Sequence, residues 1–206
     1  AGYYPDATSI VLKLIFEPES GQIFGAQAIG KEGVDKRIDI IATAIKGNLK
    51  VWDLQEVEVA YAPPYNSAKD PVNIAGYAAE NMINGEHETF RYFEIDELLQ
   101  DSNYQLLDVR TKMENRLGTI KDSINIDVNE LRDNLGSLNR DKTYLVFCQV
   151  GLRGYFAYRI LVQNGFKVKN LDGGYRLWSH TVQEQENKNI FKEDNFKHKD
   201  LNSCEE

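Results

Sequence analysis

The chain has 206 residues, a hydrophobic content of 42% and a net charge of -8. This size allows one large or two small domains with packed cores, and the acidic balance argues against a nucleic-acid partner. No apolar run approaches the ~18 residues of a membrane span, and no signal peptide is visible. Two cysteines in unlike settings make no disulfide framework, so a reducing cytoplasm is the expected location. The opening residue, Ala1, suggests a chain cut from a longer protein.

The first half predicts a small α+β domain. Apolar alternation and the turn residues between the two runs predict a β-hairpin, and helical spacing follows it. The predicted strands are 10–16 and 22–29, and the predicted helices are 34–45, 53–57 and 71–84. The polar residues 84–87 end this pattern. We therefore place a first domain at residues 1–86.

The second half alternates helices with strands and predicts an α/β domain over residues 88–182. The predicted strands are 105–109, 143–147 and 167–171, and the predicted helices are 94–100, 128–135, 153–163 and 174–182. Such alternation indicates a parallel sheet whose ligands bind beyond the carboxyl ends of its strands. The charged residues 183–206 lack a sustained period and predict a solvated tail, in which Cys204 would be an incidental thiol.

Cys148 stands at one of these strand ends, before a short loop and a helix. Backbone N–H groups and a helix N-terminus favour negative charge, so this position stabilises the nucleophilic thiolate. The alternative is an inert thiol buried in the core, as lone cysteines usually are. Gly151, which suits converging N–H groups, and the nearby cation Arg153 favour a reactive Cys148.

Two chemistries use a cysteine on such a loop. Phosphotyrosine-type phosphatases, and arsenate reductases like them, need five residues between the cysteine and the arginine so that the loop encircles an oxyanion. Here four residues separate Cys148 from Arg153. The shorter loop makes a tighter cradle, which suits a cysteine that carries one extra sulfur.

Residues 88–182 resemble a single-domain rhodanese, a sulfurtransferase. The motifs that carry this resemblance stand in the expected order. They are Leu106-Leu107-Asp108-Val109-Arg110, Glu114, Gly118-Thr119-Ile120, Ser123-Ile124-Asn125-Ile126, Cys148 to Arg153, and Leu171-Asp172-Gly173-Gly174-Tyr175-Arg176-Leu177-Trp178. The resemblance implies that Cys148 takes sulfur from a sulfane donor as a persulfide and passes it to a thiol acceptor, such as coenzyme A or another small thiol.

The same resemblance implies roles for the loop. The N–H groups of Gln149, Val150, Gly151, Leu152 and Arg153 would stabilise the persulfide, and Arg153 would position the donor. Thr119 stands where the family often has His, and Gly154 where Ser is frequent. Because Gln149, Val150 and Leu152 are uncharged, we expect a bulky persulfide donor rather than thiosulfate.

Other polar residues favour structural roles. Asp108 and Arg110 lie at a strand end and in the next turn, where such residues commonly pair with neighbours. His87 and His180 have no partners at metal-ligand spacing, so no metal site is expected.

Residues 1–86 resemble the dimerisation domain at the carboxyl end of flavin-dependent pyridine nucleotide-disulfide reductases. The residues that carry this resemblance are Gly2-Tyr3-Tyr4-Pro5, Gly25-Ala26-Gln27, Tyr61-Ala62-Pro63-Pro64-Tyr65 and Asp70-Pro71-Val72-Asn73. Both halves in this order resemble the coenzyme A-disulfide reductase branch that carries a fused rhodanese domain. The resemblance implies a homodimer through residues 1–86, with Tyr3, Tyr61 and Tyr65 reaching the partner's disulfide site.

The resemblance also implies FAD, NAD(P)H and coenzyme A for the full-length parent. No Gly-x-Gly-x-x-Gly occurs in this sequence, so we expect this chain alone to bind no flavin. The leading interpretation is sulfur transfer through Cys148 in a parent that reduces coenzyme A disulfide, persulfide or polysulfide. Its rivals are a catalytically idle binding module, a phosphatase or arsenate reductase, and a first domain that serves only as a dimer scaffold.

Overall fold

The computed structural model describes residues 2–182, and these fall into two compact units. One unit runs to His87 and the other begins at Glu88. The predicted tail and Cys204 lie outside the described residues. Within residues 2–182 no helix is long and apolar enough to cross a membrane.

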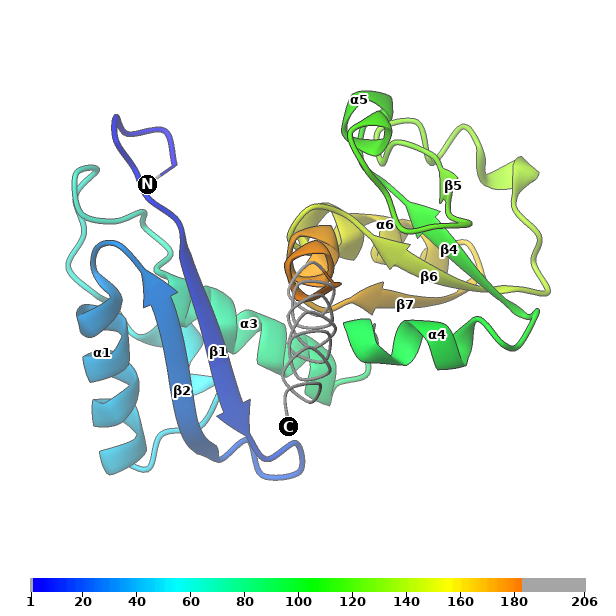
Figure 1. The fold of residues 1–206 in the computed structure, drawn as a ribbon. Helices are drawn as coiled ribbons and strands as arrows, with labels where there is room; N and C mark the ends of the chain where they lie inside the picture. Colours follow the sequence, from blue (N-terminus) through cyan, green and yellow to red (C-terminus); the bar gives the residue numbers. More distant parts are fainter. Residues whose placement is uncertain (1, 183–206) are drawn as a thin grey trace, which may run out of the picture. The chain divides into compact units, whose positions relative to one another are not determined.

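The first unit is an α+β structure built on a hairpin (Figure 1). Strand β1, Ile10–Phe16, pairs antiparallel with β2, Ile23–Gly30, and the register shifts by a bulge between Ile15 and Phe16. The helices are α1, Val34–Lys46, α2, Asp53–Glu56, and α3, Pro71–Ile83. These elements confirm the sequence prediction, and their ends differ from it by one residue.

One face of the hairpin is covered by this unit's helices. Leu12, Leu14 and Phe16 of β1 pack onto a core that contains Ile41 of α1 and Val72 of α3. Since successive strand residues point to opposite faces, the apolar residues between them are left on the other face. The hairpin therefore has one covered face and one open face, and both carry apolar side chains.

The second unit contains a five-stranded parallel sheet in the order β3-β7-β6-β4-β5 (Figure 1). This confirms the predicted α/β class. The strands are β3, Thr89–Phe90, β4, Tyr104–Asp108, β5, Ile124–Asn125, β6, Thr143–Phe147, and β7, Lys167–Leu171. The helices are η1, Tyr92–Glu94, α4, Ile95–Leu98, α5, Lys112–Arg116, η2, Leu135–Ser137, α6, Leu152–Gln163, and a final helix over 174–182.

Strand alternation divides the core of this unit between the two faces of the sheet. Tyr144 and Val146 of β6 pack with α6, whereas Leu145 and Phe147 pack on the other face with residues of α4 and the final helix. Cys148 follows the same alternation and joins the α6 side. Strand β6 therefore places Cys148 directly after its last residue, within the core on the α6 side of the sheet.

The predicted helix over 128–135 is wrong. This segment forms successive turns that end in η2, with hydrogen bonds from the N–H of residue i+3 to the carbonyl of residue i. Its Asp and Asn side chains explain the difference, because they hydrogen-bond nearby backbone and compete with helix. Asp127, for example, accepts from the N–H of Asn129 at 3.0 Å. Leu131 is still fully buried, so the apolar spacing serves packing without a helix.

Candidate active site at the cysteine loop

Cys148 lies directly after β6 and is 1% exposed. The N–H of Gly151 donates to its Sγ at 3.1 Å, and α6 begins at the next residue. Gly151 has φ of 125°, a conformation that residues with a Cβ rarely adopt. The chain can thus turn the Gly151 N–H back onto the sulfur, and a hydrogen bond of this kind favours a negatively charged sulfur.

The final helix holds the cysteine loop from the other side. The N–H groups of Tyr175 and Arg176 donate to the carbonyls of Cys148 at 2.8 Å and Gln149 at 3.0 Å. A Cβ at Gly174 would lie 2.7 Å from the Cys148 carbonyl oxygen, so a larger residue would push the helix off the loop. Two helix N-termini therefore meet at the loop, and both carry partial positive charge.

Arg110 ties the cysteine loop to three other segments. Its guanidinium donates to the Asp108 carboxylate, with the shortest bond 2.7 Å, and to the carbonyl of Gly118 at 2.7 Å. It reaches Gln149 Oε1 at 3.4 Å and lies 4.0 Å from the ring centroid of Tyr175. Because Arg110 is only 2% exposed, it holds the loop from inside the core.

Asp108 is the acceptor at the centre of this arrangement. Burial raises the pKa of its carboxyl, but hydrogen bonds from Arg110 and Asn115 outweigh this and leave the pKa below its ordinary value. Thr119 Oγ1 also donates to Asp108, at 2.9 Å. Thr119 stands where the rhodanese pattern often has His, and here its hydroxyl serves as a donor to the same carboxylate.

Arg153, in the first turn of α6, forms a bidentate ion pair with Glu114 of α5. Its Nη1 and Nη2 lie 2.8 Å and 2.6 Å from the two carboxylate oxygens. The hydrogen bond from Arg153, opposed by burial and helped by Thr111, lowers the pKa of Glu114 to about 2. Both groups are therefore charged at neutral pH, and α5 is fastened to the cysteine loop.

Asn170 of β7 lies beneath the start of α6 and is nearly buried. Its Nδ2 donates to the carbonyl of Gly151 at 3.3 Å. A Cβ at Gly154 would stand 2.2 Å from Asn170 Oδ1. Gly154, which departs from the rhodanese pattern, is thus matched to the asparagine below it.

The residues on the outer side of the loop are apolar. Val150 is 56% exposed and Leu152 is 62% exposed, while Gln149, Gly151 and Arg153 are partly covered. Val150 and Leu152 therefore give the loop an apolar outer surface above a nearly buried sulfur.

The three tyrosines predicted for the partner site are exposed in the first unit. They are Tyr3, Tyr61 and Tyr65. The loop of the last two is anchored by Asn66, whose amide donates to the buried Asp70 carboxylate, which in turn pairs with Arg37 at 2.9 Å. The loop is held in place, and its tyrosines point to solvent.

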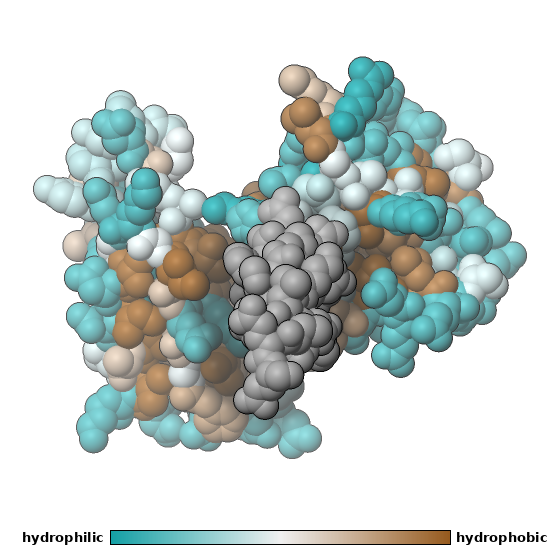
Figure 2. Space-filling view, viewed as in Figure 1, coloured by the Kyte–Doolittle hydropathy of each residue, from teal (hydrophilic) through white to brown (hydrophobic). Residues whose placement is uncertain are grey.

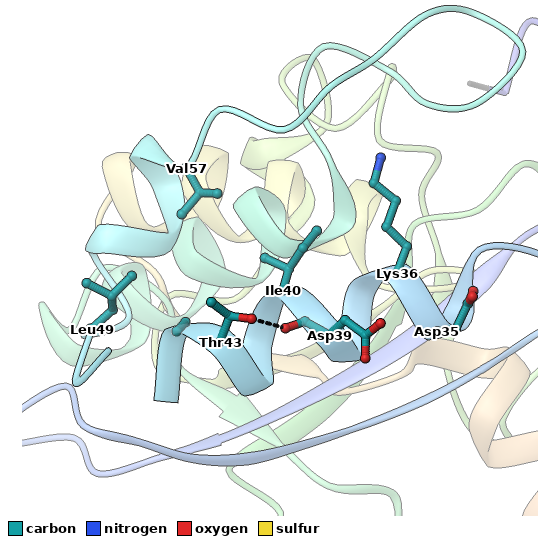
Figure 3. A pocket seen from close by; sticks show the side chains of 8 residues that line it. Asp35, Lys36, Asp39, Ile40, Thr43, Leu49 and Val57 are labelled. Atoms are coloured by element: carbon teal, nitrogen blue, oxygen red, sulfur yellow. Dashed lines mark hydrogen bonds between the residues drawn. The ribbon is translucent and has the colours of Figure 1, made fainter. Parts of the chain in front are cut away.

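A separate open groove of about 520 Å³ lies beside α1 (Figure 3). Its apolar side includes Ile40, Leu49 and Val57, and Asp35 and Asp39 stand at its edge. It contains none of the predicted site residues. No group of three or more potential metal-ligating side chains occurs within residues 2–182.

Comparison with known families matches both units. Residues 94–181 match the family described as rhodanese-like domain, and residues 1–71 match the dimerisation domain of the pyridine nucleotide-disulphide oxidoreductases. A solved structure of reduced Bacillus anthracis CoADR-RHD is 52% identical with a TM-score of 0.86, and the match covers 89% of this chain. The first unit thus matches the dimerisation domain of these oxidoreductases, and the second unit matches a rhodanese-like domain.

Other relatives of this oxidoreductase family agree with that assignment. A NAD-dependent persulfide reductase from A. fulgidus is 42% identical over 86% of this chain, with a TM-score of 0.78. A coenzyme A disulfide reductase from Staphylococcus epidermidis is 49% identical over 80 residues, which are 39% of this chain. The chain spans 33% and 32% of the two solved structures and 18% of the curated relative. The resemblance to a coenzyme A disulfide reductase with a rhodanese domain is confirmed.

A dinucleotide cofactor does not fit the residues present. Such cofactors bind where a Gly-x-Gly turn follows a strand and opens a helix, and no Gly-x-Gly occurs in this sequence. We therefore assign flavin or nicotinamide binding to no residue of this chain.

Sequence reasoning missed three features of these sites. The sequence identifies Glu114 only as a motif position and does not predict its pairing with Arg153. The segment from Thr111 to Glu114 carries a capping-box pattern that predicts a helix start and could have located α5. Asp70, followed by Pro71, likewise carries a capping-box pattern that marks the start of α3. No sequence signal marks the contacts of Asp70 with Arg37 and Asn66, or the contacts of Asn170.

Proposed function

We propose that the second unit is a rhodanese-type sulfurtransferase in which Cys148 carries sulfur as a persulfide. The observation that carries this proposal is the hydrogen bond from the Gly151 N–H to Cys148 Sγ at the joint between β6 and α6. It shows a donor already aimed at the sulfur, as a reactive thiolate requires. An inert core thiol is the alternative role for a buried cysteine, and sulfur loading distinguishes the two roles.

The reaction has two half-reactions. The Cys148 thiolate attacks the outer sulfur of a donor R–S–SH, the new S–S bond forms, and the donor's S–S bond breaks. The leaving thiolate R–S⁻ takes the bonding electron pair, and the proton stays on the transferred sulfur. An acceptor thiolate then attacks that outer sulfur, leaves as its own persulfide, and restores the Cys148 thiolate. The N–H groups of residues 149–153 would stabilise the bound outer sulfur.

Intact mass spectrometry tests the first half-reaction directly. Exposure to glutathione persulfide should add one sulfur atom to the chain, and added thiol should remove it. Cys148→Ser should abolish this gain, whereas Cys204→Ser should keep it. A gain that persists in Cys148→Ser, or no gain in the wild-type chain, would favour the idle binding module.

The phosphatase or arsenate reductase alternative has less support. Arg153, the arginine that would clamp an oxyanion, is held by both oxygens of Glu114. The loop is also one residue shorter than the phosphatase loop requires. Turnover of an aryl phosphate that is lost in Cys148→Ser would revive this alternative.

We further propose that the first unit is a homodimerisation domain of a longer protein. The open face of the hairpin carries Val11, Ile15, Phe24 and Ile29, all exposed, and Figure 2 shows apolar surface over these strands. An apolar sheet face of this kind is typical of a surface that a partner covers. The family of this unit is described as a dimerisation domain, so a second copy is the proposed partner.

Replacement of Ile29 by Lys tests the dimer surface. The variant should sediment as a monomer at concentrations where the wild-type chain is a dimer. Leu117→Lys provides a matched control, because Leu117 is equally exposed but lies in the second unit. Unchanged association of Ile29→Lys would contradict the proposal.

In the longer protein we propose reduction of coenzyme A disulfide, persulfide or polysulfide with NAD(P)H and FAD. Tyr3, Tyr61 and Tyr65 would reach the partner subunit's disulfide site, where their hydroxyls would donate to a leaving coenzyme A thiolate. A flavin bound elsewhere in the longer protein would supply the electrons for that reduction. Tyr61→Phe in the full-length enzyme should lower the rate of disulfide reduction. An unchanged rate would favour the alternative in which the first unit serves only as a dimer scaffold.

A further inference from the structure

The carboxylate of Glu114 is fully engaged by hydrogen-bond donors. Both of its oxygens accept from Arg153, and one also accepts from Thr111 Oγ1 at 2.8 Å and the Thr111 N–H at 3.1 Å. The side chains of Glu114 and Arg153 are each about one-third exposed. An incoming anion that needs the guanidinium of Arg153 must therefore displace a well-held internal carboxylate.

Arg153 is the only charged residue in the loop from Cys148 to Arg153. Hydrogen bonding to Glu114, opposed by burial, raises the pKa of its guanidinium, and the charges of Cys148 and Asp127 add to this effect. Arg153 lies in the first turn of α6, five positions after Cys148 in the same loop. The nearby cation Arg110 is compensated by Asp108, and Lys112 lies 3.5 Å from Glu130. The side-chain charges of Arg110, Lys112 and Arg153 are therefore each paired with a carboxylate.

The two classes of sulfur donor differ in their need for such charge. Attack on thiosulfate breaks the bond between its sulfane sulfur and its sulfonate sulfur, and sulfite leaves as a dianion with the electron pair. Attack on a thiol persulfide expels a thiolate that carries one negative charge. Because preorganised cations act where charge develops, an unpaired guanidinium would assist thiosulfate more than a persulfide.

We propose that Glu114 is a specificity-determining residue, which neutralises Arg153 and so favours thiol persulfides over thiosulfate as sulfur donors. This proposal rests on the proposed sulfurtransferase function of Cys148. It adds that the discrimination comes from α5, a segment outside the cysteine loop, and does not depend on the apolar loop residues alone.

Glu114→Gln is the sharpest variant, because the amide oxygen can still accept from Thr111 and Arg153 while the negative charge is lost. The measurement is kcat/KM for thiosulfate and for glutathione persulfide, with cyanide as the common acceptor. We expect the ratio of kcat/KM for thiosulfate to kcat/KM for persulfide to rise by about tenfold, because the ion pair between Glu114 and Arg153 is lost.

Glu130→Gln is the matched control. It removes a carboxylate that pairs with Lys112 of α5, the helix that also carries Glu114. This carboxylate does not pair with Arg153. The donor ratio should be unchanged in this variant. A similar rise in Glu130→Gln would mean that general surface charge governs donor choice, which would overturn the assignment of Glu114.

Arg153→Gln completes a double-mutant cycle. If Glu114 acts through Arg153, the rise in thiosulfate use should disappear in the variant that carries both substitutions. This comparison holds even if the single Glu114→Gln variant is less stable, since the ratio of two donors on the same protein cancels a loss of folded enzyme.

The outcomes separate the two proposals. If the wild-type chain takes no sulfur from glutathione persulfide, the proposed function itself fails. If the wild-type chain loads sulfur but the donor ratio is unchanged or lower in Glu114→Gln, only the role of Glu114 fails. A rise in the ratio that persists without Arg153 would also overturn it.

Discussion

In the described part of each unit, a buried arginine–aspartate pair holds a loop that contains candidate site residues. In the second unit, Arg110 and Asp108 are two residues apart and support the cysteine loop through Gln149. In the first unit, Arg37 of α1 pairs with Asp70 before α3, and Asp70 holds the tyrosine loop through Asn66. The same pair of charges thus serves a local turn in one unit and a long-range connection in the other.

The two pairs also differ in how completely they are satisfied. Within the described residues, Nε of Arg37 is buried and has no hydrogen-bond partner, whereas Nε of Arg110 donates to Asp108 at 2.9 Å. Arg110 further packs against the ring of Tyr175. When one residue of a buried ion pair is removed, the groups that were hydrogen-bonded to it are left without a partner. The loss of stability is larger when there are more such groups. The cysteine loop should therefore depend more strongly on its pair than the tyrosine loop does.

Removal of Arg110 should give the largest loss of stability. Arg110→Ala leaves the Asp108 carboxylate buried without its main partner, which should cost about 3–5 kcal/mol of unfolding free energy. The chain has one tryptophan in each unit, Trp52 and Trp178. Urea unfolding followed by Trp178 fluorescence in a Trp52→Phe background reports on the second unit alone.

Arg116→Ala is the control for that measurement, since Arg116 is an exposed arginine of the same neighbourhood. Its effect should be within the range of ordinary surface substitutions. A loss below about 1 kcal/mol for Arg110→Ala would place the pair with exposed ion pairs and contradict its structural role.

Disruption of the first unit's pair should cost somewhat less. Asp70→Asn keeps the size of the side chain but leaves Arg37 without a counter-charge, and we expect a loss of about 2–4 kcal/mol. Trp52 fluorescence in a Trp178→Phe background follows this unit. A loss larger than that of Arg110→Ala would reverse the comparison between the two pairs.

The sequence predicts best those features that depend on residues close together in the chain. Strand β6 and the position of Cys148 directly after it follow from a short apolar run and the residues beyond it. Asp108 and Arg110 are each predicted to pair with neighbours, and in the structure they pair with each other. Both families were also recognised from short ordered motifs, and the comparisons confirm them.

The remainder depended on contacts between distant segments. Glu114 and Arg153 are 39 residues apart, and Asn170 approaches Gly151 across 19 residues. Local periodicity contains no information about such pairs, since tertiary packing brings them together. The same limit explains the wrong helix at 128–135, where apolar spacing was right but the Asp and Asn side chains favoured turns.

The contact of Gly154 with Asn170 gives a prediction of intermediate size. Gly154→Ser restores the residue frequent in the rhodanese pattern, but its Cβ would stand 2.2 Å from Asn170 Oδ1. We expect a loss of about 1–3 kcal/mol from this overpacking, measured by Trp178 fluorescence. Asn170→Ala should recover part of the loss when combined with Gly154→Ser. Equal losses with and without Asn170 would show that the asparagine does not set the requirement for glycine.

The ion pair between Glu114 and Arg153 gives the smallest effect, and it should depend on pH. Glu114 has an ordinary pKa of 4.5 and a pKa of about 2 in the folded chain. A carboxyl with a lowered folded pKa contributes stability that is complete above its unfolded pKa and is lost as pH falls toward the folded value. Since both groups are about one-third exposed, we expect this contribution to be only about 1–2 kcal/mol after solvent screening.

Comparison of the wild-type chain with Glu114→Gln isolates that contribution, because all other carboxyls titrate in both. The wild-type chain should be more stable at neutral pH, and the difference should shrink as the pH falls below 4.5 toward 2. The stability of Glu130→Gln should follow the wild-type pH dependence, because Glu130 lies 3.5 Å from Lys112 and both side chains are exposed. A stability difference that stays constant down to acid pH would mean that Glu114 supports α5 through hydrogen bonds and not through its charge. The neutralisation of Arg153, and with it the proposed donor preference, would then lose its electrostatic basis.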